Sequence, residues 1–130
     1  MIYLDSSAFV KLVLPESETR LLAEFLVRHA KERLVSSTLL TIEVRRAVAR
    51  GGTGQLSYAD VLLEDVGQLP VSERIVESAS RLPGAGLRSL DAIHLATALL
   101  LRAELGAFVT YDKRLAAAAQ QHALPVVTPC

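Results

Sequence analysis

Short apolar runs alternate with longer segments of helical spacing along the whole chain. Five runs have the length and residue types of strands: residues 2–5, 34–36, 69–72, 107–110 and 124–127. Regular strand-then-helix order favours a parallel sheet covered by helices on both faces, with right-handed crossovers between the strands. No repeat, low-complexity tract or linker interrupts this order, so we expect one α/β domain over residues 1–130.

Capping and turn residues set the expected bounds of the helices. The predicted helices cover residues 8–14, 17–29, 39–50, 73–82, 89–106 and 113–122, and one more begins at Ser57. Ser6 and Ser7 are expected to cap the first helix, and Pro15 is expected to stop it. The Gly-rich segment 51–54 is expected to end a helix, and residues 83–86 to form a loop.

Four acidic residues stand where apolar runs begin or end: Asp5, Glu43, Asp91 and Asp112. Asp5 and Asp112 directly follow strand-like runs, and ligands of such sheets bind beyond the carboxyl ends of the strands. Several carboxylates can share one pocket at neutral pH only with a cation, a proton or a bound arginine. Because oxygen ligands suit hard cations, the four acids indicate a site for Mg²⁺ or Mn²⁺.

Each of these acids also has a purely structural interpretation. Asp5 could cap the helix that follows it, and so could Asp112. Glu43 could pair with Arg46, one turn later on the same helix. Asp91 could interact with the dipole at the start of its helix. The metal-site hypothesis therefore depends on the four acids taken together.

Charge and composition limit the classes of partner. The 14 Lys and Arg residues balance the 14 Asp and Glu residues, which argues against a protein that coats nucleic acid with a uniformly basic surface. Aromatic residues make up 5% of the chain and Trp is absent, so base stacking would be sparse. An enzyme with local arginine contacts is still allowed.

Cysteine usage and hydropathy indicate the compartment. Cys130 is the single cysteine, so no intramolecular disulfide is possible, as expected in a reducing compartment. The residues before Asp5 leave no room for a signal peptide. The most apolar stretch, residues 95–101, is far shorter than the ~20 residues that span a bilayer. We therefore expect a cytoplasmic protein that contacts no membrane.

Four sequence strings give the acids a recognisable context: YLDSSA at residues 3–8, TIEVR at 41–45, LRSLDAIHLAT at 87–97 and FVTYDKRL at 108–115. In this order and at these separations they resemble the motifs of the PIN-domain family, and most closely its VapC-type toxins from toxin–antitoxin pairs. The resemblance covers essentially the whole chain, and LDAIHLA is its most specific part. No acidic position departs from the family pattern.

This resemblance implies a metal-dependent ribonuclease with a three-layer α/β/α sandwich and the strand order 3-2-1-4-5. By motif position the four acids would bind Mg²⁺ or Mn²⁺, which would screen the phosphodiester and activate the attacking water, leaving a 5′-phosphate and a 3′-hydroxyl. Whether Glu43 is a ligand or a general base stays open. The hydroxyls of Ser6 and Thr110 would orient a carboxylate or a water molecule.

Basic residues near the acids are the candidates for contacts with RNA. There are four of them: Arg46, Arg50, Lys113 and Arg114. The first two follow Glu43 on one side of a helix, and the last two directly follow Asp112. Each could equally lie on a solvated face or form a local ion pair. His94, one turn beyond Asp91, could transfer protons or could be a satisfied core residue.

The implied partners are the RNA substrate and a cognate antitoxin. The C-terminal segment of the antitoxin would cover the acidic pocket, with an arginine among the carboxylates. A second copy of the chain is a further candidate because several apolar residues cluster together: Leu62, Leu63, Val66 and Leu69. These residues favour a homodimer if they lie on the surface, or they pack the core of the domain itself.

Two other protein classes fit part of the pattern. A phosphohydrolase with an aspartyl nucleophile would also place Asp5 after the first strand. Such enzymes usually have a second Asp two residues later, where this chain has Ser7. A non-catalytic, receiver-like module could bind Mg²⁺ without cutting RNA. Residues 51–54 do not form a phosphate loop, because they follow a helix and lack the Gly-Lys-Ser/Thr ending.

Overall fold

A parallel sheet forms the centre of the structure, a computed structural model that describes residues 1–52, 54–84 and 86–130. Its five strands are β1 (Ile2–Leu4), β2 (Leu34–Ser37), β3 (Gly67–Leu69), β4 (Ala107–Val109) and β5 (Val126–Val127). They lie in the order β3-β2-β1-β4-β5, with every neighbouring pair parallel. The predicted fold class and strand order are confirmed.

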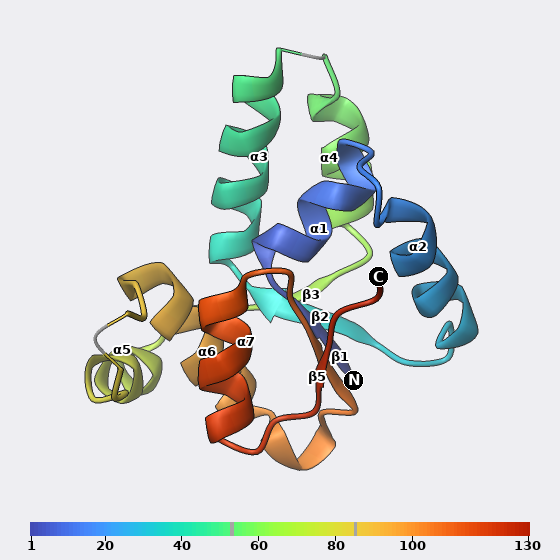
Figure 1. Cartoon of the computed structure of the whole chain (residues 1–130). Helices are drawn as coiled ribbons and strands as arrows, with labels where there is room; N and C mark the ends of the chain where they lie inside the picture. Colours follow the sequence, from blue (N-terminus) through green and yellow to red (C-terminus); the bar gives the residue numbers. More distant parts are fainter. Residues whose placement is uncertain (53, 85) are drawn as a thin grey trace.

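The helices cover both faces of this sheet (Figure 1). They are α1 (Ser6–Val13), α2 (Thr19–Arg28), α3 (Leu39–Gly51), α4 (Leu56–Leu63), α5 (Glu73–Ser80), α6 (Ser89–Leu100) and α7 (Lys113–Gln121), with a short 3-10 helix, η1 (Arg102–Glu104). Helices α3 and α4 project together away from the sheet, and α5 packs against α6. No helix within the described ranges is both long and apolar enough to cross a bilayer.

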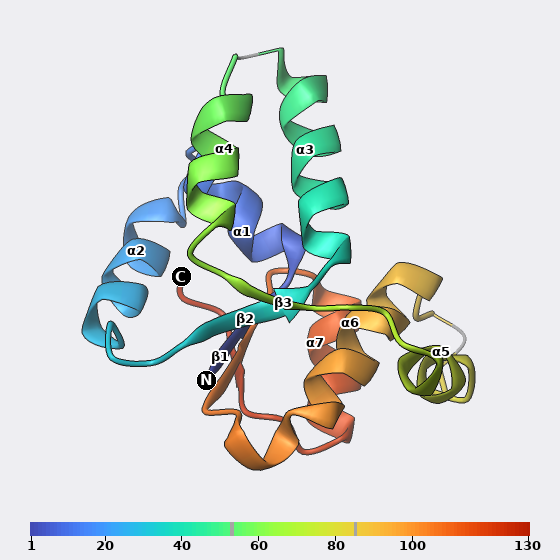
Figure 2. The same ribbon diagram turned by 180° about the vertical axis from the view of Figure 1, so that it is seen from behind.

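Alternate residues of the central strands enter two separate cores. Ile2 and Leu4 point into a core formed with α1 to α4, whereas Tyr3 points into a core formed with α6 and α7. Phe108 and Val109 of β4 divide between the two cores in the same way. This is the two-residue period of a strand, with both faces buried as parallel sheets require. The arrangement is the predicted α/β/α sandwich, seen from behind in Figure 2.

Several predicted boundaries are wrong for local physical reasons. Strand β3 ends at Leu69 instead of Ser72, because Pro70 has no N–H to donate to a sheet and Ser72 caps α5 by accepting from the Ile75 N–H. Helix α2 begins at Thr19, two residues beyond the predicted cap, Ser17. The Thr19 hydroxyl is engaged in the preceding turn, where it accepts from the Glu16 N–H and donates to the Lys11 carbonyl.

Two more boundaries depend on contacts with the sheet. Asp5, instead of Ser6 or Ser7, caps α1. The helix predicted to reach Gly106 ends at Leu100, and η1 then returns the chain to β4, where the Gly106 N–H donates to the Met1 carbonyl. The two expected Gly-rich turns are described only in part, because residues 53 and 85 lie outside the described residues. The described part of the first includes Gly52, which caps α3 in the left-handed conformation.

The apolar cluster considered as a dimer surface lies mainly inside the molecule. Leu63 and Val66 are buried, and Leu62 packs against the same core. The interpretation that these residues fill the core of the chain itself is therefore correct for these three, whereas Leu69 on β3 is only half-buried. Apolar side chains that are exposed occur elsewhere on α4, at Leu56 and Val61.

The contrast between Leu40 and Ile42 on α3 tests this core. Leu40 is completely buried, whereas Ile42 is 58% exposed. We expect Leu40→Ala to lower the free energy of unfolding by roughly 2–5 kcal/mol through lost burial and the cavity left behind. Ile42→Ala should change it by about 0.5 kcal/mol or less. Urea unfolding followed by circular dichroism measures both, and equal losses in the two variants would contradict this packing.

Candidate active site

Asp5 is buried at the carboxyl end of β1, where its carboxylate accepts hydrogen bonds from three residues. The Ser7 hydroxyl lies 2.7 and 2.9 Å from its two oxygens, and the Ala8 N–H donates to Oδ1 at 3.0 Å. The Thr110 hydroxyl donates to Oδ2 at 2.6 Å. Burial raises the pKa of Asp5, and these hydrogen bonds oppose that shift. Asp5 therefore has both the capping role and a place at the strand end.

The two hydroxyls that contact Asp5 are themselves fixed by the chain beyond β4. The Tyr111 N–H donates to Ser7 Oγ at 2.9 Å, and the Asp112 N–H donates to Thr110 Oγ1 at 3.1 Å. One hydrogen-bonded network thus joins the end of β1, the start of α1 and the turn after β4. Thr110 thus contacts both the Asp5 carboxylate and the backbone of Asp112.

Glu43 projects from α3 toward α6 and α1. Its Oε1 lies 2.6 Å from Nε2 of His94, and its Oε2 accepts from the Ser6 hydroxyl at 3.2 Å. Within the described part of the chain its hydrogen-bond partners are these two residues and not Arg46, so the alternative interpretation of Glu43 as the ion-pair partner of Arg46 is not supported. The Ser6 hydroxyl and the His94 ring thus contact the two oxygens of the Glu43 carboxylate from different elements.

Asp91 and Asp112 line a separate small cavity of about 280 Å³ with Arg88, Lys113 and Arg114. Asp91 lies in the first turn of α6. Asp112 caps α7, because its Oδ1 accepts from the N–H of Leu115 at 2.9 Å. Asp91 is thus placed to interact with the helix dipole of α6, and Asp112 is a helix cap, as their structural interpretations have it. Neither position prevents the carboxylate from binding a cation as well.

Repulsion among the acids is visible at Asp91. Burial raises its pKa most, followed by the charge of Asp112, and the charges of Asp5 and Glu43 act in the same direction. His94 acts in the opposite direction. All four predicted acids are therefore close enough to interact electrostatically, although Glu43 lines a different cavity from Asp91 and Asp112.

The donor set suits a hard divalent cation, because every candidate ligand is a carboxylate oxygen. Among residues 1–52, 54–84 and 86–130, no three Asp, Glu, His or Cys side chains are already arranged to bind one metal ion. The site is thus a convergence of negative charge and not a finished coordination shell. Asp5 and Glu43 accept hydrogen bonds through both carboxylate oxygens, whereas Asp91 and Asp112, which share one cavity, have more carboxylate oxygens available to a cation.

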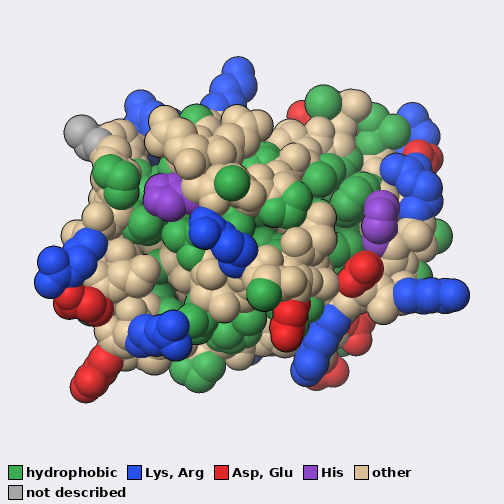
Figure 3. Space-filling model, turned by 90° about the horizontal axis from the view of Figure 1, so that it is seen from below, with side chains coloured by type: hydrophobic (Ala, Val, Ile, Leu, Met, Phe, Trp, Pro, Cys, Tyr) green, Lys and Arg blue, Asp and Glu red, His purple; other side chains and the backbone are tan. Residues whose placement is uncertain are grey.

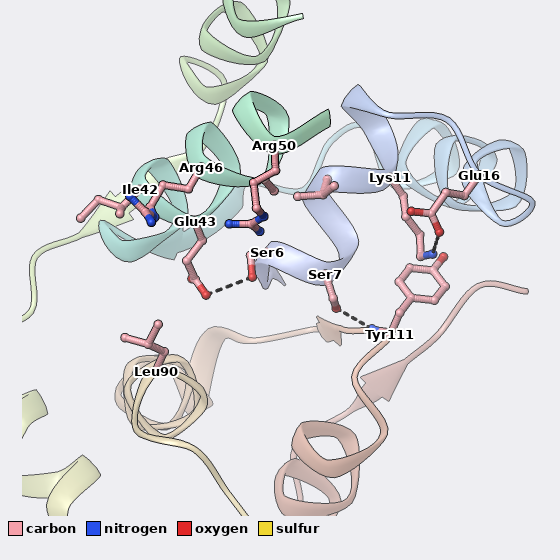
Figure 4. A pocket seen from close by; sticks show the side chains of 12 residues that line it. Ser6, Ser7, Lys11, Glu16, Ile42, Glu43, Arg46, Arg50, Leu90 and Tyr111 are labelled. Carbon is pink, nitrogen blue, oxygen red and sulfur yellow. Dashed lines mark hydrogen bonds and ion pairs between the residues drawn. The ribbon is translucent and has the colours of Figure 1, made fainter. Parts of the chain in front are cut away.

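A larger cavity of about 610 Å³ opens between α1 and α3 (Figure 4). Glu43 and Ser6 lie at one end, with the side chains of Arg46 and Arg50 above them on α3. Both predicted arginines therefore line the same hollow as an acid of the site. Lys113 and Arg114 lie beside Asp91 and Asp112 in the smaller cavity. All four cations are exposed.

Sequence reasoning missed three residues that shape this site: Ser7, Tyr3 and Arg88. The sequence pattern indicates Ser7 as a helix cap and as a departure from the phosphohydrolase motif, although its spacing of two residues from Asp5 is typical of a local hydroxyl–carboxylate bond. Arg88 lies just before α6 and shares a cavity with Asp91. The link from Tyr3 through His94 to Glu43 joins residues far apart in sequence, so no local pattern could have indicated it.

Comparison with known proteins gives a consistent family. A profile of the PIN domain matches residues 2–128. The chain is 42% identical to Ribonuclease VapC47 of Mycobacterium tuberculosis over 132 residues, which cover 99% of this chain and 97% of that protein. It is 41% identical to Ribonuclease VapC46 of the same organism over 129 residues, covering 98% and 97% of the two chains.

Solved structures show the same fold. A toxin–antitoxin complex from Klebsiella pneumoniae contains a chain with a TM-score of 0.75 and 25% identity, covering 100% of this chain and 98% of that one. A structure of FitAB bound to an IR36 DNA fragment has a TM-score of 0.73 at 16% identity, with 99% and 95% coverage. The chain therefore belongs to the PIN-domain family. Its relatives within that family are VapC proteins, which confirms the resemblance found in the sequence motifs.

The raised pKa of the Asp91 carboxyl predicts how the stability of the folded chain depends on pH. Because its pKa is raised in the folded state, the folded protein binds this proton more tightly than the unfolded chain does. The contribution of Asp91 to the free energy of unfolding therefore becomes less favourable as pH rises from the ordinary carboxyl pKa of about 3.9 through the raised pKa. We expect Asp91→Asn, measured in EDTA, to raise Tm at pH 7 and to have little effect near pH 4.

The exposed Asp65 provides the matched control for this experiment. Asp65→Asn should change Tm little at either pH, because its carboxylate is already solvated. Differential scanning fluorimetry at pH 4 and pH 7 makes the comparison. An Asp91→Asn protein that melts at or below the wild-type temperature at pH 7 would contradict the repulsion described above.

Proposed function

We propose that this chain is a divalent-metal-dependent endoribonuclease and the toxin of a toxin–antitoxin pair. The observation on which this proposal rests is the convergence of Asp5, Glu43, Asp91 and Asp112: burial raises the pKa of Asp91 most, and the charges of the other three acids raise it further. The names of the VapC relatives, which are ribonucleases, support the same activity.

A bound Mg²⁺ or Mn²⁺ would supply charge screening at the phosphodiester and acidify water for attack on phosphorus. Asp91 and Asp112 would hold the ion, with Asp5 and Glu43 completing the negative site. Hydrogen bonds to Asp5 from Ser7 and Thr110 keep that carboxylate in one orientation. Glu43, which is partly exposed at the wall of the large cavity, is the acid best placed to accept a proton from water there.

Two features argue against an aspartyl-nucleophile phosphohydrolase. Asp5 is only 3% exposed, so a substrate phosphorus atom has little access to it. Both of its oxygens already accept hydrogen bonds. A nucleophile needs a free lone pair directed at the substrate. Asp5 instead has the surroundings of a fixed, structural carboxylate that contributes charge.

Contacts with RNA would be local. Basic and acidic side chains are interspersed over the face drawn in Figure 3, in agreement with the balanced charge of the chain. Arg46 and Arg50, on the wall of the large cavity, would bind phosphates on one side of the acids, and Lys113 and Arg114 would do so on the other. The RNA backbone would then cross above the acidic centre.

The proposed partners follow from this site. An antitoxin segment with an arginine could neutralise the carboxylates and occupy the large cavity, and the toxin–antitoxin complex with the same fold supports such a partner. A homodimer and a cytoplasmic location stay predictions. For the homodimer, the exposed apolar residues Leu56, Tyr58 and Val61 of α4 offer surface that a second copy could cover.

The primary test is cleavage of a mixed pool of structured RNA by the purified chain with Mg²⁺, Mn²⁺ or EDTA. We expect metal-dependent cleavage, and we expect its rate to fall by more than about 100-fold in Asp91→Asn. A loss of that size exceeds the effect of removing a residue that only supports a metal ligand. Asp5→Asn should also be inactive, because the side-chain amide carries no negative charge and its nitrogen cannot accept from Thr110.

The control for this assay is Asp65→Asn, which removes an exposed carboxylate of the same kind outside the site. It should cleave RNA like the wild type. Wild-type protein that binds metal but hydrolyses only a small phosphate ester would favour the phosphohydrolase. Metal binding without either activity would favour the receiver-like module.

A second test concerns the arginines of the large cavity. In an Asp91→Asn background, which keeps the RNA intact, Arg46→Ala and Arg50→Ala should each weaken RNA binding by up to about fivefold, as expected for an exposed charge contact. Each loss should also reduce the slope of log affinity against log salt by about 0.7. Fluorescence anisotropy over a salt series measures both quantities. Arg81→Ala, on the far α5 side, is the control, and an equal loss there would refute a local RNA path.

A further inference from the structure

His94 lies between Tyr3 and Glu43 and contacts both. Its Nδ1 is 2.7 Å from the Tyr3 hydroxyl, and its Nε2 is 2.6 Å from Glu43 Oε1. The imidazole is 1% exposed, whereas the Glu43 side chain is 20% exposed at the cavity wall. The contact therefore runs from the interior of the protein to an acid of the site.

The chemistry of the three groups determines where the hydrogens lie. A carboxylate can only accept, so the hydrogen of the His94–Glu43 bond belongs to Nε2. In the neutral ring the other nitrogen is then an acceptor, which suits donation from the phenol of Tyr3. Burial raises the pKa of Tyr3, so this phenol keeps its proton. No buried side-chain nitrogen or oxygen in the described ranges is left without a partner.

The inner end of this chain of contacts is rigid. Tyr3 is completely buried in β1, and its ring stacks on Phe108 of β4 with centroids 5.2 Å apart. The same ring meets the imidazole of His94 edge-on at 5.8 Å. The position of His94 is thus set by the two central strands of the sheet. Glu43, by contrast, has a long side chain that would otherwise sample many rotamers.

We propose that His94 is a positioning residue: its Nε2–H fixes the Glu43 carboxylate at the site, and the Tyr3 hydroxyl holds the ring in that tautomer. Ser6 restrains the second oxygen of Glu43, so the carboxylate is oriented from both sides. The catalytic consequence rests on the proposed ribonuclease function. The hydrogen-bond geometry does not, and it can be tested separately.

Two amide substitutions separate positioning from simple core packing. In His94→Gln the side-chain amide nitrogen reaches about as far as Nε2 and can donate to Glu43. In His94→Asn it reaches only as far as Nδ1 and cannot. We expect kcat within about threefold of wild type for His94→Gln and a loss of about 10–100-fold for His94→Asn, with KM for RNA unchanged in both. His29→Asn, at an exposed histidine, is the control.

The separate measurement is the tautomer of His94, observed by ¹⁵N NMR of the wild-type protein at pH 7.5. The three histidines are distinguished by the signal that disappears in His94→Gln. We expect a hydrogen on Nε2 and none on Nδ1. A hydrogen on Nδ1 would overturn the proposal, and so would equal kcat values for folded Asn and Gln variants. If the wild type cleaves no RNA, the ribonuclease function fails, and the NMR result still decides the geometry.

Discussion

The rest of the site depends on the hydrogen bonds that the buried carboxylate of Asp5 accepts. It accepts from Ser7, from the Ala8 N–H and from Thr110, and so joins the end of β1 to the start of α1 and to the turn after β4. A charge buried to this extent is tolerated only with such partners. The same bonds therefore build the local fold and place one negative charge at the sheet edge, where the other acids converge.

The remaining acids reach this point from different layers. Glu43 comes from α3 on one face of the sheet, and Asp91 comes from α6 on the other. Burial raises the pKa of Asp91 most and the like charges of the other acids raise it further, so bringing these acids together opposes folding at neutral pH. Proteins accept such a cost where function needs it, and cation binding is the interaction that would reverse it. His94 helps to offset it, because it joins the α6 side to Glu43 by a partly buried hydrogen bond.

Particular residues explain which parts could be predicted from sequence. Strand order and the acids at positions 5, 43, 91 and 112 followed from strand-like runs and family motifs, and the sheet matches that order. Helix ends were less predictable, because Ser72 and Thr19 make local hydrogen bonds that compete with the simple pattern. The alternative Glu43–Arg46 pair does not form because the long Glu43 side chain has several partners within reach, and it contacts the buried imidazole of His94 and the Ser6 hydroxyl instead.

The sequence by itself determined the periodic pattern, the family and the identity of the four acids, because these depend on residue type and local spacing. Only the tertiary structure decided what each acid contacts. Glu43 and His94 are 51 residues apart, and Thr110 is 105 residues from Asp5. Such partners meet because β1 lies between β2 and β4 and helices pack on both faces. Long-range packing therefore sets the orientation of each carboxylate, for which no local signal exists in the chain.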